Sequence, residues 1–232
     1  LVNDTAGDAD LENNTVVQAF TIVKPAPGMN MKLDQAVVTA DVTESSPAIV
    51  AITGNITVTN LGGEAMNISL VSDVDIGWRS GIHPGQFQAG HDGRYAFSAC
   101  VTVPQGSSTS NIGRVQISAN GLTGNATVRA SAAAVIQVNP YYRLTLDSKA
   151  GYIELPPGGQ AVFEIMLTNA GNSLDSYEIW VDNLKELVAK KWLVALSANT
   201  LAGLQPGEYK RFRVTARAPD EWTLSKSEST RI

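Results

Sequence analysis

The sequence predicts an all-β protein made of two β-sandwiches in tandem, preceded by one extra strand. A repeated segment supports this prediction, because the pattern at residues 56–73 returns without a gap at residues 165–182. In each copy apolar residues alternate with polar ones on both sides of a Thr-Asn break, as in a strand, a turn and a second strand. Charged residues make up only 17% of the chain, a composition that suits β-sandwiches better than helical bundles.

The first copy of the repeated segment is expected to form two strands with one buried face. Ile56 and Val58 lie on the core side of the first strand, and Ile68 and Leu70 on the core side of the second. Between the strands, the sequences NLGGEA and NAGNSLD of the two copies supply asparagine and glycine, which tolerate the backbone angles of tight turns.

The match between the two halves continues after the repeated segment. Trp78 corresponds to Trp192 after an insertion, and the strand at 95–104 corresponds to the strand at 210–219. Both strands end in proline, which cannot continue a hydrogen-bonded ladder. The inserted residues 183–191 have apolar side chains at helical spacing and predict a short helix.

Turn residues divide the chain into units. The segments KPAPGMN and NPYY interrupt the strand pattern and are expected to be the joints between units. Residues 1–30 are an acidic segment and a strand, either a remnant of a preceding module or a donor strand. Residues 31–138 form a first immunoglobulin-like sandwich of roughly seven strands, and residues 139–232 a second. Within the first sandwich the Asn-Gly pair at 120–121 predicts a hairpin turn.

The sequence GGQAVFEIMLTNAGNSLDSYEIWVDN, followed by LQPGEYKRFRVTARAP, resembles immunoglobulin-like modules that repeat in archaeal and bacterial envelope proteins. Such modules also adjoin the catalytic domains of some secreted glycosidases. The segment DADLENNTVVQAFTI at 8–22 resembles the closing strands of CARDB-type domains, which are adhesion-related immunoglobulin-like domains of bacteria and archaea. The resemblance implies a fold and an extracellular location, and it implies no catalytic residues.

Both ends of the chain depart from the pattern of the first sandwich. After Pro219 the second unit has only DEWTLSKSESTRI, whereas the first unit continues through two or three more strands. At the other end, TVVQAFTIV is a strand without a domain of its own. Three explanations are open. The chain is an excerpt from a longer array, the second sandwich is simply shorter, or the spare strand completes the second unit of another copy in a head-to-tail filament.

The third explanation has a physical motive. A sandwich that lacks a strand leaves backbone groups unpaired, and a free strand leaves apolar side chains in water. The more apolar face of the predicted assembly strand, expected to be buried, consists of Val16, Gln18, Phe20 and Ile22, and the other face of Val17, Ala19, Thr21 and Val23.

Charge and hydropathy limit the partners. The net charge is −5, and residues 1–138 carry 6 Lys and Arg against 11 Asp and Glu, whereas residues 139–232 carry 11 of each. No basic patch with interleaved aromatic residues is present, so nucleic acid is not an expected partner. No sufficiently long apolar run is present either, so contact with a membrane is expected only through a segment outside this chain.

Asparagine sequons favour an extracellular location. The single cysteine, Cys100, excludes a disulfide within the chain, so the protein would not depend on disulfides there. Asn-x-Ser/Thr, the acceptor of N-linked glycans, occurs five times, and strand alternation places three of these asparagines on polar faces. The alternative is that they are ordinary polar residues of strand faces. The predicted glycosylation sites are Asn3, Asn13, Asn55, Asn67 and Asn125.

Patterns that indicate chemistry are weak. The only histidines, His83 and His91, lie in a Gly- and Pro-rich loop, and no serine-nucleophile motif is present, so no enzymatic activity is expected. Acidic side chains could bind calcium, which takes oxygen ligands, or could belong to solvated loops. The candidate calcium ligands are Asp4, Asp8, Asp10, Asp73 and Asp75.

These observations predict an extracellular structural protein of an archaeal or bacterial cell surface. Its modules are expected to build a surface layer, a filament or pilus, or an adhesive stalk, with further copies of the chain and other cell-surface proteins as partners. The alternative is an accessory or carbohydrate-binding module of a secreted hydrolase. No cofactor is expected apart from the calcium considered above.

Overall fold

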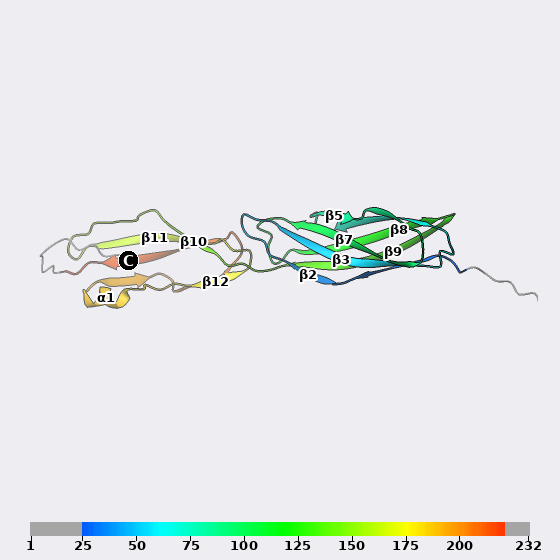
Figure 1. Cartoon of the computed structure of the whole chain (residues 1–232). Helices are drawn as coiled ribbons and strands as arrows, with labels where there is room; N and C mark the ends of the chain where they lie inside the picture. The colour runs from blue at the N-terminus through cyan, green and yellow to red at the C-terminus, as the bar shows by residue number, and fades with distance from the viewer. Residues whose placement is uncertain (1–24, 221–232) are drawn as a thin grey trace, which may run out of the picture.

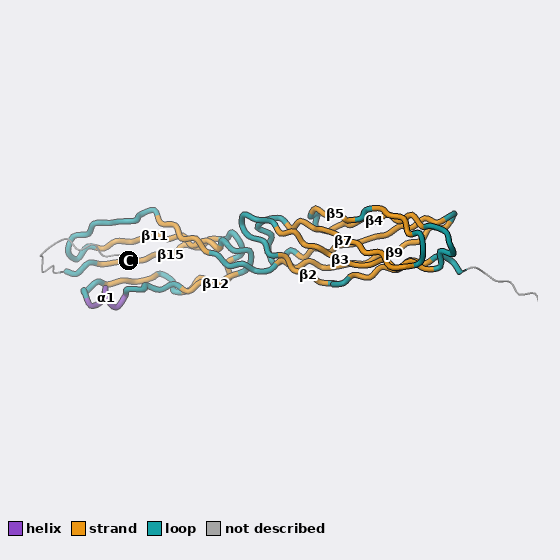
Figure 2. The backbone as a smooth tube through the Cα atoms, in the orientation of Figure 1, coloured by secondary structure: helices purple, strands orange, loops and turns teal. Residues whose placement is uncertain are grey.

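The computed structural model describes residues 25–220, which form two all-β sandwiches lying end to end (Figure 1). Over these described residues the backbone consists of strands and loops with one short helix (Figure 2). The predicted assembly strand at 15–23 lies outside the described residues. No helix within residues 25–220 is long and apolar enough to cross a membrane.

The first sandwich contains nine strands. Their bounds are β1 (Gly28–Leu33), β2 (Val37–Ala40), β3 (Ala48–Thr59), β4 (Met66–Val74), β5 (Arg79–His83), β6 (Gln86–Ala89), β7 (Gly93–Val103), β8 (Ile112–Thr123) and β9 (Ala126–Val138). One sheet has the order β1-β3-β7-β5 and the other the order β2-β9-β8-β4-β6. Neighbouring strands are antiparallel, except that β2 pairs with β9 in parallel.

The core of this sandwich lies between its two sheets, as the alternation of the repeated segment predicts. Ile56 and Val58 of β3 are fully buried, and Ile68 and Leu70 of β4 are 2% and 5% exposed. All four belong to one cluster that also includes inner residues of β7, β8 and β9. Since successive side chains of a strand point to opposite faces, their polar neighbours lie on the outside.

The hairpin turn predicted at Asn120-Gly121 is wrong. Strand β8 passes through this pair and ends at Thr123, and the turn to β9 lies at residues 124–125. Gly121 has a packing role instead, because a Cβ atom at this position would lie 2.5 Å from the Sδ of Met66. The missing side chain therefore makes room for a core methionine of β4.

The second sandwich has fewer strands within the described residues. Its elements are β10 (Leu144–Ser148), β11 (Gln160–Asn169), β12 (Asp175–Glu178), α1 (Leu184–Ala189), β13 (Leu193–Leu196), β14 (Thr200–Leu204) and β15 (Tyr209–Arg217). One sheet has the order β10-β11-β15-β13, and β12 and β14 form a second sheet of two strands. Helix α1 confirms the predicted short helix, and its Leu187 is 1% exposed.

Candidate assembly face of the second sandwich

The described sequon asparagines all belong to the first sandwich. Asn55 is half-buried in β3, and Asn125 is exposed in the turn between β8 and β9. Asn67 is exposed on β4, where its Oδ1 accepts a hydrogen bond of 3.1 Å from Nε2 of Gln88. Glycosylation of these residues stays a prediction. Two sequon positions lie outside the described residues, Asn3 and Asn13.

The predicted calcium ligands are only partly described. Asp73 is exposed on β4, and Oδ1 of Asp75 accepts a hydrogen bond of 2.9 Å from the backbone N–H of Arg114. Asp75 therefore has a structural role at the start of β8. Among residues 25–220, no group of three or more His, Cys, Asp and Glu side chains is placed to hold a metal ion. The other candidate ligands lie outside the described residues, and these are Asp4, Asp8 and Asp10.

The second sandwich has no counterparts of β8 and β9 within the described residues. In the first sandwich, β4 pairs with β6 along one edge and with β8 along the other. The corresponding strand of the second sandwich, β12, pairs with β14. In residues 25–220 the other edge of β12 has no strand partner.

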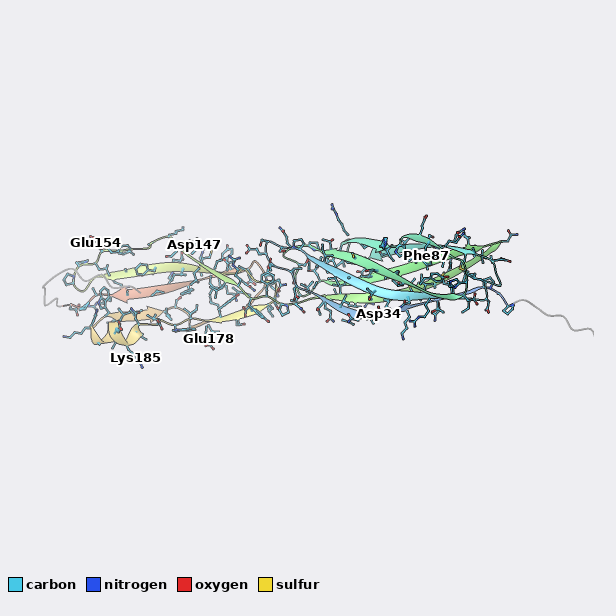
Figure 3. The ribbon with its side chains drawn as sticks, viewed as in Figure 1. Asp34, Phe87, Asp147, Glu154, Glu178 and Lys185 are labelled. Atoms are coloured by element: carbon cyan, nitrogen blue, oxygen red, sulfur yellow. The ribbon has the colours of Figure 1, made fainter. Side chains whose placement is uncertain are left out.

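The core side of β10 is exposed to solvent. Leu144 lies directly opposite Asn169, and Leu146 opposite Leu167, two residues of β11 that are 0% and 3% exposed. Directly opposite residues on neighbouring strands point to the same face of a sheet. Leu144 and Leu146 therefore point to the core side, yet they are 46% and 59% exposed. Their neighbour Asp147 lies on the outside of the same sheet (Figure 3).

Equivalent residues of the two copies of the repeated segment differ in burial. Ile56 of β3 is fully buried, whereas its counterpart Ile165 of β11 is half-buried, as is Phe163. In the first sandwich β9 contacts β1, and the Cε of Met29 on β1 lies 3.7 Å from the position of a Cβ atom at Gly121 of β8. Strands β8 and β9 thus cover the side of the core that no strand of residues 25–220 covers in the second sandwich.

We name this surface the open face, and it comprises Leu144, Leu146, Phe163, Ile165 and the unpaired edge of β12. Burying a fully exposed leucine side chain contributes about 1.5–3 kcal/mol, so covering the half-exposed Leu144 or Leu146 contributes roughly half of that. An unpaired strand edge also presents N–H and C=O groups to any added strand. The open face can therefore accept a β-strand with one apolar side.

Tyr177 of β12 lies beside the open face and is 9% exposed. Its hydroxyl donates a hydrogen bond of 3.5 Å to the backbone oxygen of Arg143. Burial, together with a hydrogen bond to Asp175 and the charge of that carboxylate, raises the pKa of Tyr177 from 10.0 to about 12. The hydroxyl is therefore neutral over a wider pH range in the folded state than in the unfolded chain.

Above pH 10 this pKa shift should destabilise the second sandwich. The tyrosine ionises in the unfolded chain near its ordinary pKa of 10.0 but resists ionisation when folded until about 12. The contribution of the neutral Tyr177 hydroxyl to stability is therefore complete below pH 10, and it is lost as the pH rises through about 12. Urea unfolding at about pH 9 and about pH 11.5 should show a larger loss for the parent chain than for Tyr177→Phe. Equal losses in the two proteins would mean that Tyr177 does not titrate differently on folding.

No protein-family model matches this sequence, and no curated protein matches it. Among solved structures, the chain is similar to the ASH/PapD-like domain 7 of human CEP192, with 10% identity and a TM-score of 0.34 over 54% of this chain and 94% of that one. It is also similar to the Escherichia coli chaperone DraB, with 12% identity and a TM-score of 0.30 over 78% of this chain and 84% of DraB. A further similarity is to a chain of the CsuC-CsuE chaperone–tip adhesion subunit complex of Acinetobacter baumannii. The identity is 11% and the TM-score 0.27, over 84% of this chain and 89% of that one. At these values the function has to be inferred from the strand pairing of the chain itself.

Proposed function

We propose that this chain is a non-enzymatic structural protein of the cell exterior, which builds a surface assembly through the open face of its second sandwich. The observation that supports the proposal is the exposure of Leu144 and Leu146, 46% and 59%, on the core side of their sheet. An added strand would cover these side chains and pair with the free edge of β12. Such strand addition gives affinity through backbone hydrogen bonds and specificity through alternate side chains.

The donor in this proposal is the segment 15–23 of a second copy, which lies outside the described residues. Its sequence supports the role, because Val16, Phe20 and Ile22 fall on one side of an extended chain and match the apolar character of the open face. Each copy then carries a donor at one end and an acceptor at the other. A contact of this kind repeats head to tail and builds a surface layer, filament or stalk.

The extracellular location belongs to the same proposal. Asn67 and Asn125 are exposed, so glycans there would not enter the core. Further copies of the chain and other cell-surface proteins are the proposed partners.

A charge placed on the open face should abolish assembly. We expect Leu146→Lys to remain monomeric at concentrations at which the parent chain forms oligomers in sedimentation-velocity experiments. The side chain of Leu146 is already 59% exposed, so the variant should fold with a stability within about 0.5 kcal/mol of the parent. Thr145→Lys is the matched control, because Thr145 is an exposed residue of the same strand on the opposite face, and this variant should assemble normally.

Deleting residues 15–23 tests the donor separately. The deleted chain should stay monomeric and should bind a synthetic peptide of that sequence, and Leu146→Lys should abolish the peptide binding. If the deletion variant assembled like the parent while Leu146→Lys did not, another segment would be the donor. Normal assembly of Leu146→Lys would contradict the proposed function itself.

A further inference from the structure

The end of β11 and the turn that follows it, residues 169–174, lie where the two sandwiches meet. This segment contains two asparagines that are almost completely buried, Asn169 at 0% and Asn172 at 1% exposure. Among the described residues only Thr123 is a comparably buried polar side chain. Buried polar groups are stable only when their hydrogen-bonding capacity is satisfied, so the partners of these asparagines are informative.

The side chain of Asn172 joins three segments of the chain. Its Nδ2 donates hydrogen bonds of 3.1 Å to the backbone oxygen of Ser107, in the loop between β7 and β8, and 3.1 Å to the backbone oxygen of Asn139. Its Oδ1 accepts a hydrogen bond of 2.8 Å from the backbone N–H of Tyr141. One amide of the second sandwich therefore binds the first sandwich and the linker between them.

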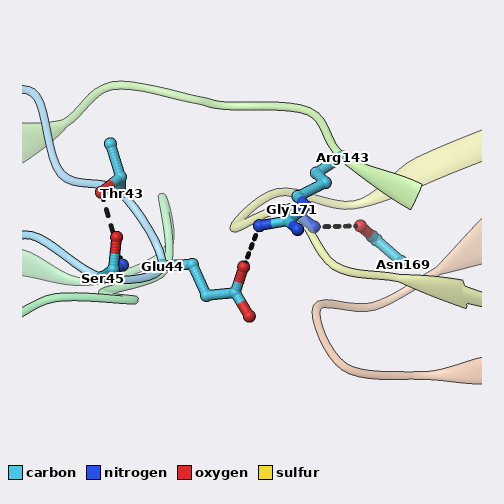
Figure 4. Close-up of polar contacts among 6 residues, drawn as sticks. All are labelled: Thr43, Glu44, Ser45, Arg143, Asn169 and Gly171. Carbon is cyan, nitrogen blue, oxygen red and sulfur yellow. Dashed lines mark hydrogen bonds and ion pairs between the residues drawn. The ribbon is translucent and has the colours of Figure 1, made fainter. Parts of the chain in front are cut away.

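Backbone contacts of the same turn add to this connection. The N–H of Thr109, in the first sandwich, donates a hydrogen bond of 3.0 Å to the backbone oxygen of Asn172. The N–H of Ala170 donates one of 2.8 Å to the backbone oxygen of Arg143 in the linker. Arg143 also forms an ion pair with Glu44 of the first sandwich, which Figure 4 shows across the gap between the units. The contacts thus reach the first sandwich at two separate loops.

The first copy of the repeated segment lacks this arrangement. The counterpart of Asn169 is Asn60. Its Nδ2 donates a hydrogen bond of 3.2 Å to the backbone oxygen of Ala26, in the segment that leads into the first sandwich. The counterpart of Asn172 is Gly63, at a φ of +85°, which has no side chain to bridge two units. Asn169 instead bonds Ser173, Leu204 and Gly171 within its own sandwich. The bridging side chain of Asn172 is therefore specific to the joint between the two described sandwiches.

We infer that Asn172 fixes the orientation of the two sandwiches, so that they move as one rigid rod. Domains joined by a short linker and a small polar interface move relative to each other by default. Here a buried amide with two donated bonds and one accepted bond specifies a single arrangement. The rod also fixes the direction of the open face relative to the first sandwich. The inference stands whether or not the open face accepts a strand.

Distances between two spin labels, measured by double electron–electron resonance, test the rigidity directly. One label is attached to Cys100, the single native cysteine, which is exposed on the first sandwich, and the other to an Asp147→Cys substitution on β10. The doubly labelled chain is diluted in unlabelled chain, so that only distances within one molecule are measured. We expect one narrow distance distribution for the parent and a width increased by about twofold or more in Asn172→Ala, as for domains with a weak interface. Asn120→Ala, at an exposed position of β8, should leave the width unchanged.

A second variant changes the joint sterically and does not remove a hydrogen bond. A Cβ atom at Gly171 would lie 2.6 Å from the backbone oxygen of Tyr141, so Gly171→Ala should displace the linker and shift or broaden the distance distribution. Near-ultraviolet circular dichroism of both variants checks that each sandwich stays folded. A broad distribution in the parent chain would overturn the inference. An unchanged distribution in Asn172→Ala would overturn it as well, whatever the result for Gly171→Ala.

Discussion

Replacing Ile56 by alanine should lower the free energy of unfolding of the first sandwich by about 2–5 kcal/mol, the usual cost of truncating a large buried side chain. Replacing its repeat counterpart, Ile165, should cost the second sandwich clearly less in the unassembled chain. Ile56 is 0% exposed between two complete sheets, so its truncation leaves a cavity that the neighbours cannot fill. Ile165 is a half-buried residue of the open face, where solvent already reaches it.

Urea unfolding of the two variants, followed separately for each sandwich, measures this difference. Ile49→Ala is the control for strand β3, because Ile49 is 75% exposed and its truncation should change stability by less than about 0.5 kcal/mol. In assembled material Ile165→Ala should become as costly as Ile56→Ala, since a donor strand would then cover the site. Equal costs in the unassembled chain would mean that the core of the second sandwich is already closed.

Asn169→Ala should destabilise the second sandwich by about 3 kcal/mol, because each buried backbone group left without a partner costs roughly 1–3 kcal/mol. The Nδ2 of Asn169 donates hydrogen bonds of 2.8 Å and 2.9 Å to the oxygens of Ser173 and Leu204, and its Oδ1 accepts 2.9 Å from the N–H of Gly171. Alanine would remove the asparagine partner of all three groups, of which the N–H of Gly171 and the oxygen of Leu204 belong to buried residues. Thermal or urea unfolding of the second sandwich measures the loss.

Two further substitutions make this prediction specific to the amide. Asn169→Asp keeps the accepting oxygen but places an ionised carboxylate against two carbonyl oxygens, so it should be at least as damaging as alanine. Asn120→Ala, on the exposed face of β8, should change stability by less than about 0.5 kcal/mol. A stable Asn169→Asp variant would show that the donated hydrogen bonds contribute little.

Much of the fold could be predicted because strand alternation is a local property. The apolar positions of β3 and β4 follow a period of two, and their burial confirms the prediction. The spacing of Leu184 and Leu187 likewise predicted α1. The Asn-Gly pair at 120–121 gave a wrong turn prediction, because the same dipeptide occurs both in turns and within strands. Here it lies within a strand, where the glycine makes room for a neighbouring methionine.

The open face and the joint depend on long-range pairing, which the sequence does not show directly. Leu144 and Leu146 alternate with polar residues like any half-buried strand, and only the absence of a covering strand in residues 25–220 makes them exposed. Asn172 looks like an ordinary turn residue. One difference could have indicated its role, because the two copies of the repeated segment place Gly63 and Asn172 at the same position.

A structure of the assembled material tests the central claim most directly, because it shows what covers Leu144 and Leu146. We predict that a strand from another copy, residues 15–23, lies over these two leucines and pairs with the free edge of β12. Leucines that remain in contact with solvent in the assembly, or that are covered by residues of their own chain, would contradict assembly through the open face.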